Sequence, residues 1–268
     1  IPSNRIWIRD FGPIYLINEK EKKKNFINFG FNGWSKYKNY KKDNTINNYI
    51  SRITRIDKVE PKLQIGNMIK NFILEGGAID VNGKGSILLT EECLLSKVQQ
   101  RNIGINKNIY EKTLSKLLNV KNFIWLKKGI KGDDTHGHID DISRFVSPNT
   151  IMTAIERDKN DKNYKILEQN YKILKGARNL DGKKFNIIKI PMPKTIIIQK
   201  IRVPASYLNF LICNKMVLLP LFNDFNDKKV IEIFKKFFKK KKIVGIDCRD
   251  LIWGFGAIHC MTQHEPKV

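Results

Sequence analysis

Short runs of apolar residues that end in polar residues and glycine recur along the chain. They begin near Trp7, Phe72, His138, Ser206 and Ile252, at nearly constant intervals except for the shorter last one. A near-constant interval indicates repeated supersecondary units. We therefore expect each run to form the first strand of one unit, with its polar residues at one end of that strand.

Most of these runs are followed by a second strand, a helix and a third strand. Second strands are expected at residues 85–90, 150–154 and 216–220, after turns at Asn82-Gly83 and Asn214-Lys215 that predict hairpins. Apolar residues at spacings of three and four predict helices at 108–118, 162–174 and 227–239, with strands following at 186–190 and 242–246. This order predicts an α/β fold of β-β-α-β units, and units arranged around an axis would bring their polar strand ends together.

The chain shows no internal boundary. No linker of low complexity divides it, and the polar segments 18–25 and 36–48 are expected to be surface loops. We therefore predict a single domain over residues 1–268. Because the sequence begins with Ile1-Pro2 rather than Met, we expect a natural N-terminal segment to be missing from it.

The composition is that of a globular protein with a basic surface. Hydrophobic residues make up 41% of the chain, enough for a sizeable core, and no apolar run is long enough to span a membrane. A net charge of +24 is typical of nucleic-acid binding, but the lysines are scattered among Asn and Ile. The densest patch, residues 235–242, follows an amphipathic segment and fits an exposed helix end. Nucleic acid is therefore an unfavoured partner.

Cysteine usage points to a reducing compartment, so a cytoplasmic location is expected. The four cysteines, Cys93, Cys213, Cys248 and Cys260, include no C-x-x-C pair, which argues against a disulfide scaffold and a zinc ribbon. No phosphate-binding glycine loop of the P-loop or dinucleotide type occurs either, so nucleotide cofactors are not indicated.

Cys260 is the candidate nucleophile. Gly254 and Gly256 precede it and the polar pair Thr262-Gln263 follows it, a setting unlike that of a core strand. Cysteines are often buried and inert, and this alternative stands if the residue is taken alone. A thiolate becomes a catalytic nucleophile when a proton-transferring group lies beside it.

The segment around His138 supplies such a group. His138 and Asp140 alternate with Ile139, so on a strand both would face one side. An exposed turn is one alternative. A metal site formed by His136, His138 and Asp140 is another, but no further firm ligands are evident and the nearby thiol explains the histidine better.

Two more carboxylates are flanked by glycine. Asp10 precedes Gly12-Pro13 and could be a turn residue paired with Arg9. Glu75 follows an apolar run, where an unpaired carboxylate is costly, and this favours a functional partner. Carboxylates of this kind can hold a cationic substrate.

Five motifs together resemble those of the agmatine deiminase family. They are WIRDFGP at residues 7–13, LEGG at 74–77, GHID at 137–140, SYLNF at 206–210 and IHCMTQ at 258–263. That family is grouped with the Porphyromonas-type peptidylarginine deiminases in the guanidine-modifying superfamily. The resemblance implies a five-bladed pseudo-symmetric α/β propeller of ββαβ units, with the first blade incomplete in this chain.

The resemblance also implies roles for the candidate residues. Cys260 is the nucleophile and His138 the general acid and base, while the carboxylates that face the guanidinium are Asp10, Glu75 and Asp140. Trp7 and Gly256 join these carboxylates as substrate-binding residues.

The sequence departs from the family pattern in two places. Phe255 and Ala257 stand where the family has glycine and asparagine, so Phe255 is expected to narrow the pocket and a polar contact is lost. The family's N-terminal segment before the W-x-R-D motif is also absent.

The implied reaction is hydrolysis of agmatine to N-carbamoylputrescine and ammonia through a covalent thiouronium intermediate, a step of putrescine biosynthesis. It needs no metal and no organic cofactor. We also expect that the protein can form a homo-oligomer. Deimination of peptidyl or free arginine, and amidino transfer, remain alternatives within the same chemistry. A basic nucleic-acid-binding protein with a degenerate site is the alternative from another class.

Overall fold

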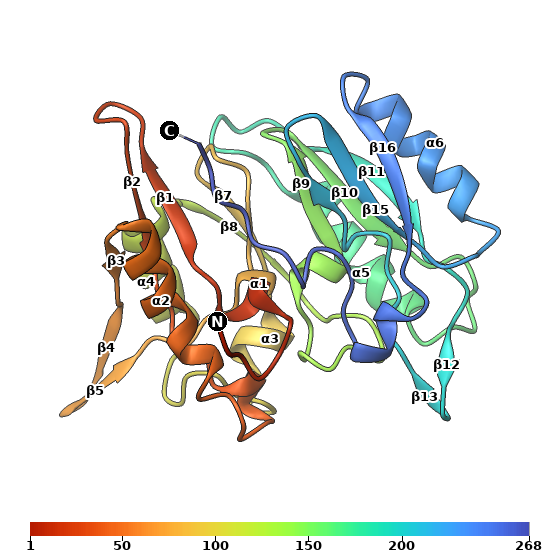
Figure 1. Ribbon diagram of the computed structural model, residues 1–268. Helices are drawn as coiled ribbons and strands as arrows, with labels where there is room; N and C mark the ends of the chain where they lie inside the picture. Colours follow the sequence, from red (N-terminus) through yellow and green to blue (C-terminus); the bar gives the residue numbers. More distant parts are fainter. Residues whose placement is uncertain (268) are drawn as a thin grey trace.

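Four three-stranded sheets, each built in the order β-β-α-β, dominate the computed structural model, which describes residues 1–267 (Figure 1). In each sheet the first two strands are antiparallel and the third lies parallel to the second. A parallel return requires a crossover, and each crossover contains one helix of nine residues or more, with the short α3 as an addition in the second unit. The predicted mixed α/β fold and its repeating unit are therefore confirmed.

The four units have the following bounds. The first contains β1 (Ile14–Asn18), β2 (Lys23–Ile27), α2 (Ile46–Thr54) and β3 (Lys58–Val59). The second contains β6 (Asp80–Val81), β7 (Ser86–Thr90), α4 (Lys107–Leu118) and β8 (Asn122–Leu126). The third contains β9 (Ser143–Ser147), β10 (Thr150–Ile155), α5 (Tyr164–Gly176) and β11 (Asn186–Pro191). The fourth contains β14 (Leu211–Ile212), β15 (Met216–Leu221), α6 (Asp227–Phe237) and β16 (Lys242–Asp247).

Shorter elements lie between these units or within their crossovers. Two hairpins project from the sheets, β4 (Lys62–Ile65) with β5 (Met68–Asn71) and β12 (Ile197–Ile198) with β13 (Ile201–Arg202). Short helices are α1 (Ile8–Phe11) and α3 (Glu91–Leu95), and 3₁₀ turns cover Gly33–Ser35, Asp43–Thr45, Gly76–Ala78, Ile139–Asp141 and Leu251–Gly254. Among the described residues, no helix is both long and apolar enough to cross a membrane.

Local sequence signals explain the helix ends where they are strong. The Asn106 side chain accepts a hydrogen bond from the backbone N–H of Ile109 at 3.1 Å and so caps the start of α4. Asn119 ends the same helix in the left-handed region, with a φ of 54°. This helix therefore lies within one residue of the predicted range.

Two expectations about the fold are wrong in part. The runs at residues 6–16, 72–80, 138–146, 205–212 and 251–260 were expected to form strands, but in the first four the strand (β1, β6, β9 or β14) occupies only the end of the run and a turn precedes it, and the run at 251–260 contains no strand. The described residues form four three-stranded sheets, so five blades, with the first one incomplete, stay a prediction. The polar segments 18–25 and 36–48 were expected to be loops, but they include the start of β2 and of α2.

Helix α6 packs on its sheet through Phe234, which is fully buried and lies with its ring centroid 4.9 Å from that of Phe210. We expect Phe234→Ala to lower the free energy of unfolding by about 3–5 kcal/mol, because it removes buried area and leaves a cavity. Phe225, which is 80% exposed, provides the matched control. Denaturant unfolding of both variants measures the difference, and an equal effect of Phe225→Ala would contradict this account of the core.

Candidate active site

The structure brings the predicted polar residues together from different units. Asp10 lies in α1, Glu75 directly precedes the turn Gly76–Ala78, and Asp140 lies in the turn Ile139–Asp141 that His138 caps. Cys260 lies in a turn at residues 258–261, after the 3₁₀ turn Leu251–Gly254. All five side chains are buried, with exposed fractions of 6% or less.

His138 lies between two of the carboxylates. Its Nδ1 is 3.7 Å from Asp10 Oδ1, and its Nε2 is 3.7 Å from Glu75 Oε2. It does not lie on a strand, so the expected alternation with Asp140 is not what places the two side chains in one site. The backbone N–H of His138 donates to Asp133 Oδ2 at 2.9 Å, which fixes the start of the turn.

Gly77 marks the centre of the cluster. A Cβ atom at this position would lie 2.6 Å from His138 Nδ1, 2.8 Å from Asp10 Oδ1 and 3.2 Å from Asp140 Oδ2. Only glycine therefore leaves room for the three groups to approach one another. The backbone N–H of Gly77 also donates to Asp10 Oδ1 at 3.2 Å.

Asn209 organises the nucleophile, a role that sequence reasoning missed although the residue lies in the SYLNF motif. Its Nδ2 lies 3.0 Å from Cys260 Sγ, while its Oδ1 accepts the backbone N–H groups of His259 and Cys260 at 2.9 and 3.2 Å. Cys260 Sγ also lies 3.8 Å from Asp140 Oδ2, which accepts a 2.7 Å bond from His259 Nδ1. The thiol is thus held by one amide and faces one carboxylate.

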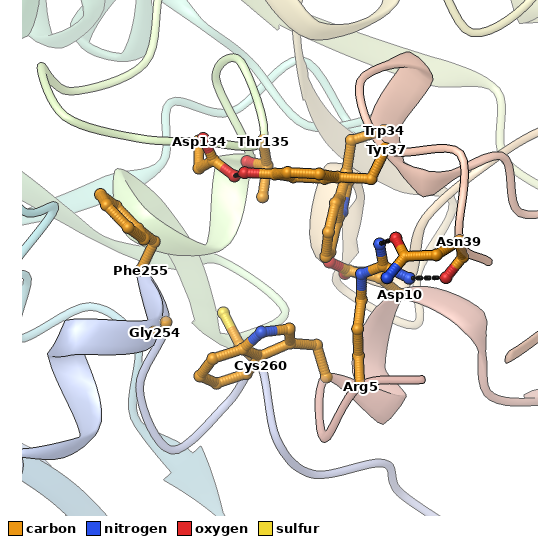
Figure 2. Close-up of a pocket in the computed structure, with 12 residues that line it drawn as sticks. Arg5, Asp10, Trp34, Tyr37, Asn39, Asp134, Thr135, Gly254, Phe255 and Cys260 are labelled. Atoms are coloured by element: carbon orange, nitrogen blue, oxygen red, sulfur yellow. Dashed lines mark hydrogen bonds between the residues drawn. The ribbon is translucent and has the colours of Figure 1, made fainter. Parts of the chain in front are cut away.

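A cavity of about 240 Å³ leads to this cluster, and Figure 2 shows the sulfur of Cys260 pointing into it between Phe255 and Trp34. Asp10 and Cys260 line the cavity, whereas Glu75, His138 and Asp140 lie buried outside its lining. Its lining residues are Arg5, Trp7, Asp10, Trp34, Tyr37, Asn39, Asp134, Thr135, Gly254, Phe255, Gly256 and Cys260.

The wall beside Cys260 depends on Trp7 and two glycines. A Cβ atom at Gly254 or Gly256 would lie 2.6 or 2.7 Å from the Trp7 ring, so the indole packs directly on this backbone. Phe255, between the two glycines, has a φ of 64°, an unfavourable conformation for a bulky side chain. Trp7 and Gly256 therefore lie at the site, as predicted, and Phe255 occupies part of the cavity wall.

Arg101 is a second residue that the sequence reasoning missed. Its Nε lies 3.0 Å from Glu75 Oε1 with both side chains fully buried, and its remaining donors reach the backbone oxygens of Gln99 and Thr135. Burial would raise the pKa of Glu75, but the Arg101 guanidinium and the His138 ring together outweigh it and lower that pKa to about 2. Glu75 is therefore a permanent anion.

The thiol and the imidazole are both biased toward their protonated forms. Burial would lower the pKa of His138, but the Asp10 carboxylate and further partners raise it well above its ordinary value. Burial, followed by the charges of Asp140 and Asp141, raises the pKa of Cys260 well above its ordinary value. The free site thus holds an imidazolium and a neutral thiol, so thiolate formation requires an additional positive charge nearby.

Several buried polar atoms of the site have no hydrogen-bond partner among the described residues. They are Glu75 Oε2, Asp140 Oδ1 and both ring nitrogens of His138. The two carboxylate oxygens are buried acceptors without donors, which is costly, and a planar cation with several N–H groups would satisfy them. Combined with a thiol and an acid, this arrangement suits nucleophilic attack on a cationic planar carbon.

The alternative metal trio of His136, His138 and Asp140 is not assembled. Within residues 1–267, two groups have potential ligand atoms within 4.8 Å of one another, Glu75 with Cys93 and His138, and Asp140 with Asp141 and Cys260. His136 belongs to neither, and its Nε2 lies 3.3 Å from Ser96 Oγ.

The pairing of Asp10 with Arg9 is also not found, because Arg9 binds His259 O and Gln263.

Comparison with known proteins agrees with this geometry. Residues 1–266 match the family model of Porphyromonas-type peptidyl-arginine deiminase. A curated relative from Latilactobacillus sakei subsp. sakei (strain 23K), named "Putative agmatine deiminase", is 35% identical over 98% of this chain and 76% of its own. The solved agmatine deiminase of Enterococcus faecalis is 32% identical with a TM-score of 0.88, over 97% of this chain and 74% of its own. A C. jejuni agmatine deiminase solved with substrate bound is 32% identical with a TM-score of 0.84, over 96% of this chain and 72% of its own.

The charge on His138 can be tested through Asp10. Removing this anion by Asp10→Asn destabilises the imidazolium and lowers the pKa of His138, so its proton is lost at lower pH. We expect the alkaline, descending limb of the pH profile of kcat/KM to move to lower pH by about one unit or more. Asp247→Asn, which alters an exposed pair with Arg249, is the control and should leave the limb in place. A limb that stays unmoved in Asp10→Asn would show that Asp10 does not set this charge.

Proposed function

Because this chain belongs to the Porphyromonas-type peptidyl-arginine deiminase family, we propose that it hydrolyses agmatine to N-carbamoylputrescine and ammonia. The single observation that carries this proposal is the set of unpartnered buried acceptors beside a thiol. Glu75 Oε2 and Asp140 Oδ1 have no donor within the described structure, and Cys260 Sγ lies 3.8 Å from the other oxygen of Asp140. A guanidinium presents N–H groups on its edges and an electrophilic carbon at its centre, which suits these groups.

The proposed mechanism follows from the charges of the site. Binding of the guanidinium favours loss of the Cys260 proton to solvent, because a positive charge stabilises the thiolate. The thiolate attacks the guanidinium carbon, and the His138 imidazolium protonates the departing nitrogen, which leaves as ammonia. The neutral His138 then takes a proton from water as it attacks the thiouronium carbon. The carbon–sulfur bond breaks with its electron pair going to the Cys260 sulfur, and the hydroxyl proton passes to solvent, which leaves the ureido product.

The entrance of the cavity favours agmatine over arginine. Arg5 is the one cationic side chain in the described lining, and it is already bound to Asn39 and Asp43. Asp134, also in the lining, accepts from Tyr37 Oη at 2.7 Å and pairs with Lys36. The two cations near the entrance are therefore both engaged, Arg5 with Asp43 and Lys36 with Asp134, so neither is free to bind the α-carboxylate of arginine.

The arrangement of the units supports a five-bladed fold acting as one domain over residues 1–268. Asp10, Glu75, Asp140 and Asn209 each lie a few residues before the first strand of their unit, namely β1, β6, β9 and β14. We infer that Cys260 occupies the same place in a fifth unit. Every group of the proposed mechanism would then come from the same position in its blade.

A substrate panel tests the choice of substrate. We expect kcat/KM for ammonia release to be on the order of 100-fold higher for agmatine than for L-arginine or an arginyl peptide, since a substrate carboxylate would compete with Asp134 for Lys36. In Asp134→Asn this preference should narrow. Equal or faster turnover of arginine or of the peptide would contradict the proposal.

The nucleophile can be identified by trapping. Acid quenching during agmatine turnover, followed by peptide mass spectrometry, should show an adduct on the peptide that contains Cys260. Cys260→Ser should abolish turnover without changing the thermal unfolding midpoint, because an alcohol is a far weaker nucleophile. Adducts on Cys93, Cys213 or Cys248 would refute this assignment.

A further inference from the structure

We propose that Glu75, Cys93 and His138 form an inhibitory site for a soft divalent cation such as Zn²⁺. One thiol sulfur, one imidazole nitrogen and one carboxylate oxygen of these residues lie within 4.8 Å of one another. All three side chains are buried, with exposed fractions of 0%, 0% and 1%. Thiolate, imidazole and carboxylate are the ligands that Zn²⁺ takes in proteins.

The cation has to displace one proton of the His138 imidazolium and the thiol proton of Cys93, and no other hydrogen bond of the site has to break. Neither ring nitrogen of His138 nor Oε2 of Glu75 has a hydrogen-bond partner among the described residues, while the other oxygen of Glu75 is held 3.0 Å from Arg101. Tetrahedral zinc with bonds of about 2.0–2.3 Å places its ligand atoms roughly 3.5 Å apart. Small side-chain rotations therefore close the site.

The backbones that carry the thiol and the imidazole share one support. Thr90 caps α3, where its Oγ1 accepts the backbone N–H of Cys93 at 3.2 Å and donates to the carbonyl of Gly137 at 2.6 Å. The backbone N–H of His138, the residue after Gly137, donates to Asp133 Oδ2 at 2.9 Å. The two ligands are thus positioned before a cation arrives, which reduces the cost of binding.

A cation at this position would stop catalysis. It would occupy the lone pairs of His138 and Glu75, which the proposed mechanism requires for proton transfer and for substrate binding, and would release the Cys93 proton. The cavity reaches Asp10, whose Oδ1 lies 3.7 Å from His138 Nδ1, so it ends beside the proposed site, while Glu75, Cys93 and His138 lie buried beyond its lining. Metal and substrate therefore exclude each other.

The binding site can be tested without turnover by titrating Co²⁺ into Cys260→Ala, which lacks the nucleophilic thiol. Coordination by Cys93 produces a near-ultraviolet thiolate-to-cobalt charge-transfer band, and Zn²⁺ should displace it. The band should disappear in Cys93→Ala/Cys260→Ala and in the closely isosteric Cys93→Ser/Cys260→Ala. Cys248→Ala/Cys260→Ala, which removes a different buried thiol, should retain it.

Inhibition gives the second measurement. Zn²⁺ should inhibit the unmodified protein in competition with agmatine, EDTA should restore activity, and Cys93→Ser should weaken inhibition about tenfold or more. A missing band in Cys260→Ala, or a band that survives loss of Cys93, overturns the site whatever the substrate proves to be. Inhibition that is unchanged in Cys93→Ser overturns it as well.

Discussion

Burial of several carboxylates around one imidazole is the constraint on which the rest of the site depends. Asp10 and Glu75 approach His138 to 3.7 Å on opposite ring nitrogens, and Asp140 lies on the same side as the thiol. Buried charges of one sign are tolerated only with compensating charges beside them. Arg101 compensates Glu75 and the imidazolium compensates Asp10, whereas burial raises the pKa of Asp140 to about 7. A guanidinium beside Asp140 would favour the ionised form that burial disfavours.

The fold meets this constraint by separating the charged groups along the chain. Each carboxylate comes from a turn that precedes a different sheet, so no local segment has to carry the repulsion alone. The sheets and their helices then fix the turns through two extended hydrophobic cores. Packing of the cores thus offsets the electrostatic repulsion between the buried carboxylates. Functional sites often hold such unfavourable groups in place in this way.

Local periodicity predicted the helices α4, α5 and α6 and the strands around them, because amphipathic patterns are encoded residue by residue. The polar positions at the centre were also visible, since carboxylates and histidine beside glycine contrast with apolar neighbours. The roles of Arg101 and Asn209 could not be predicted from the sequence. Arg101 contacts Glu75, 26 residues away in the sequence, and Asn209 contacts Cys260, 51 residues away. The chain has a net charge of +24 and many Asn residues, so one arginine or one asparagine does not stand out in the sequence.

The strand expectation at residues 138–142 failed for a related reason. On a strand, His138 and Asp140 would face the same side, and in the observed 3₁₀ turn they also lie at one site. The sequence pattern therefore does not distinguish the strand from the turn. The turn accomplishes more, because Ile139 stays in the core while Asp141 reaches Asn209, the residue that holds Cys260. One turn thereby couples the acid, a substrate carboxylate and the support of the nucleophile. A change in its backbone should disturb all three at once, whereas a strand would have separated them.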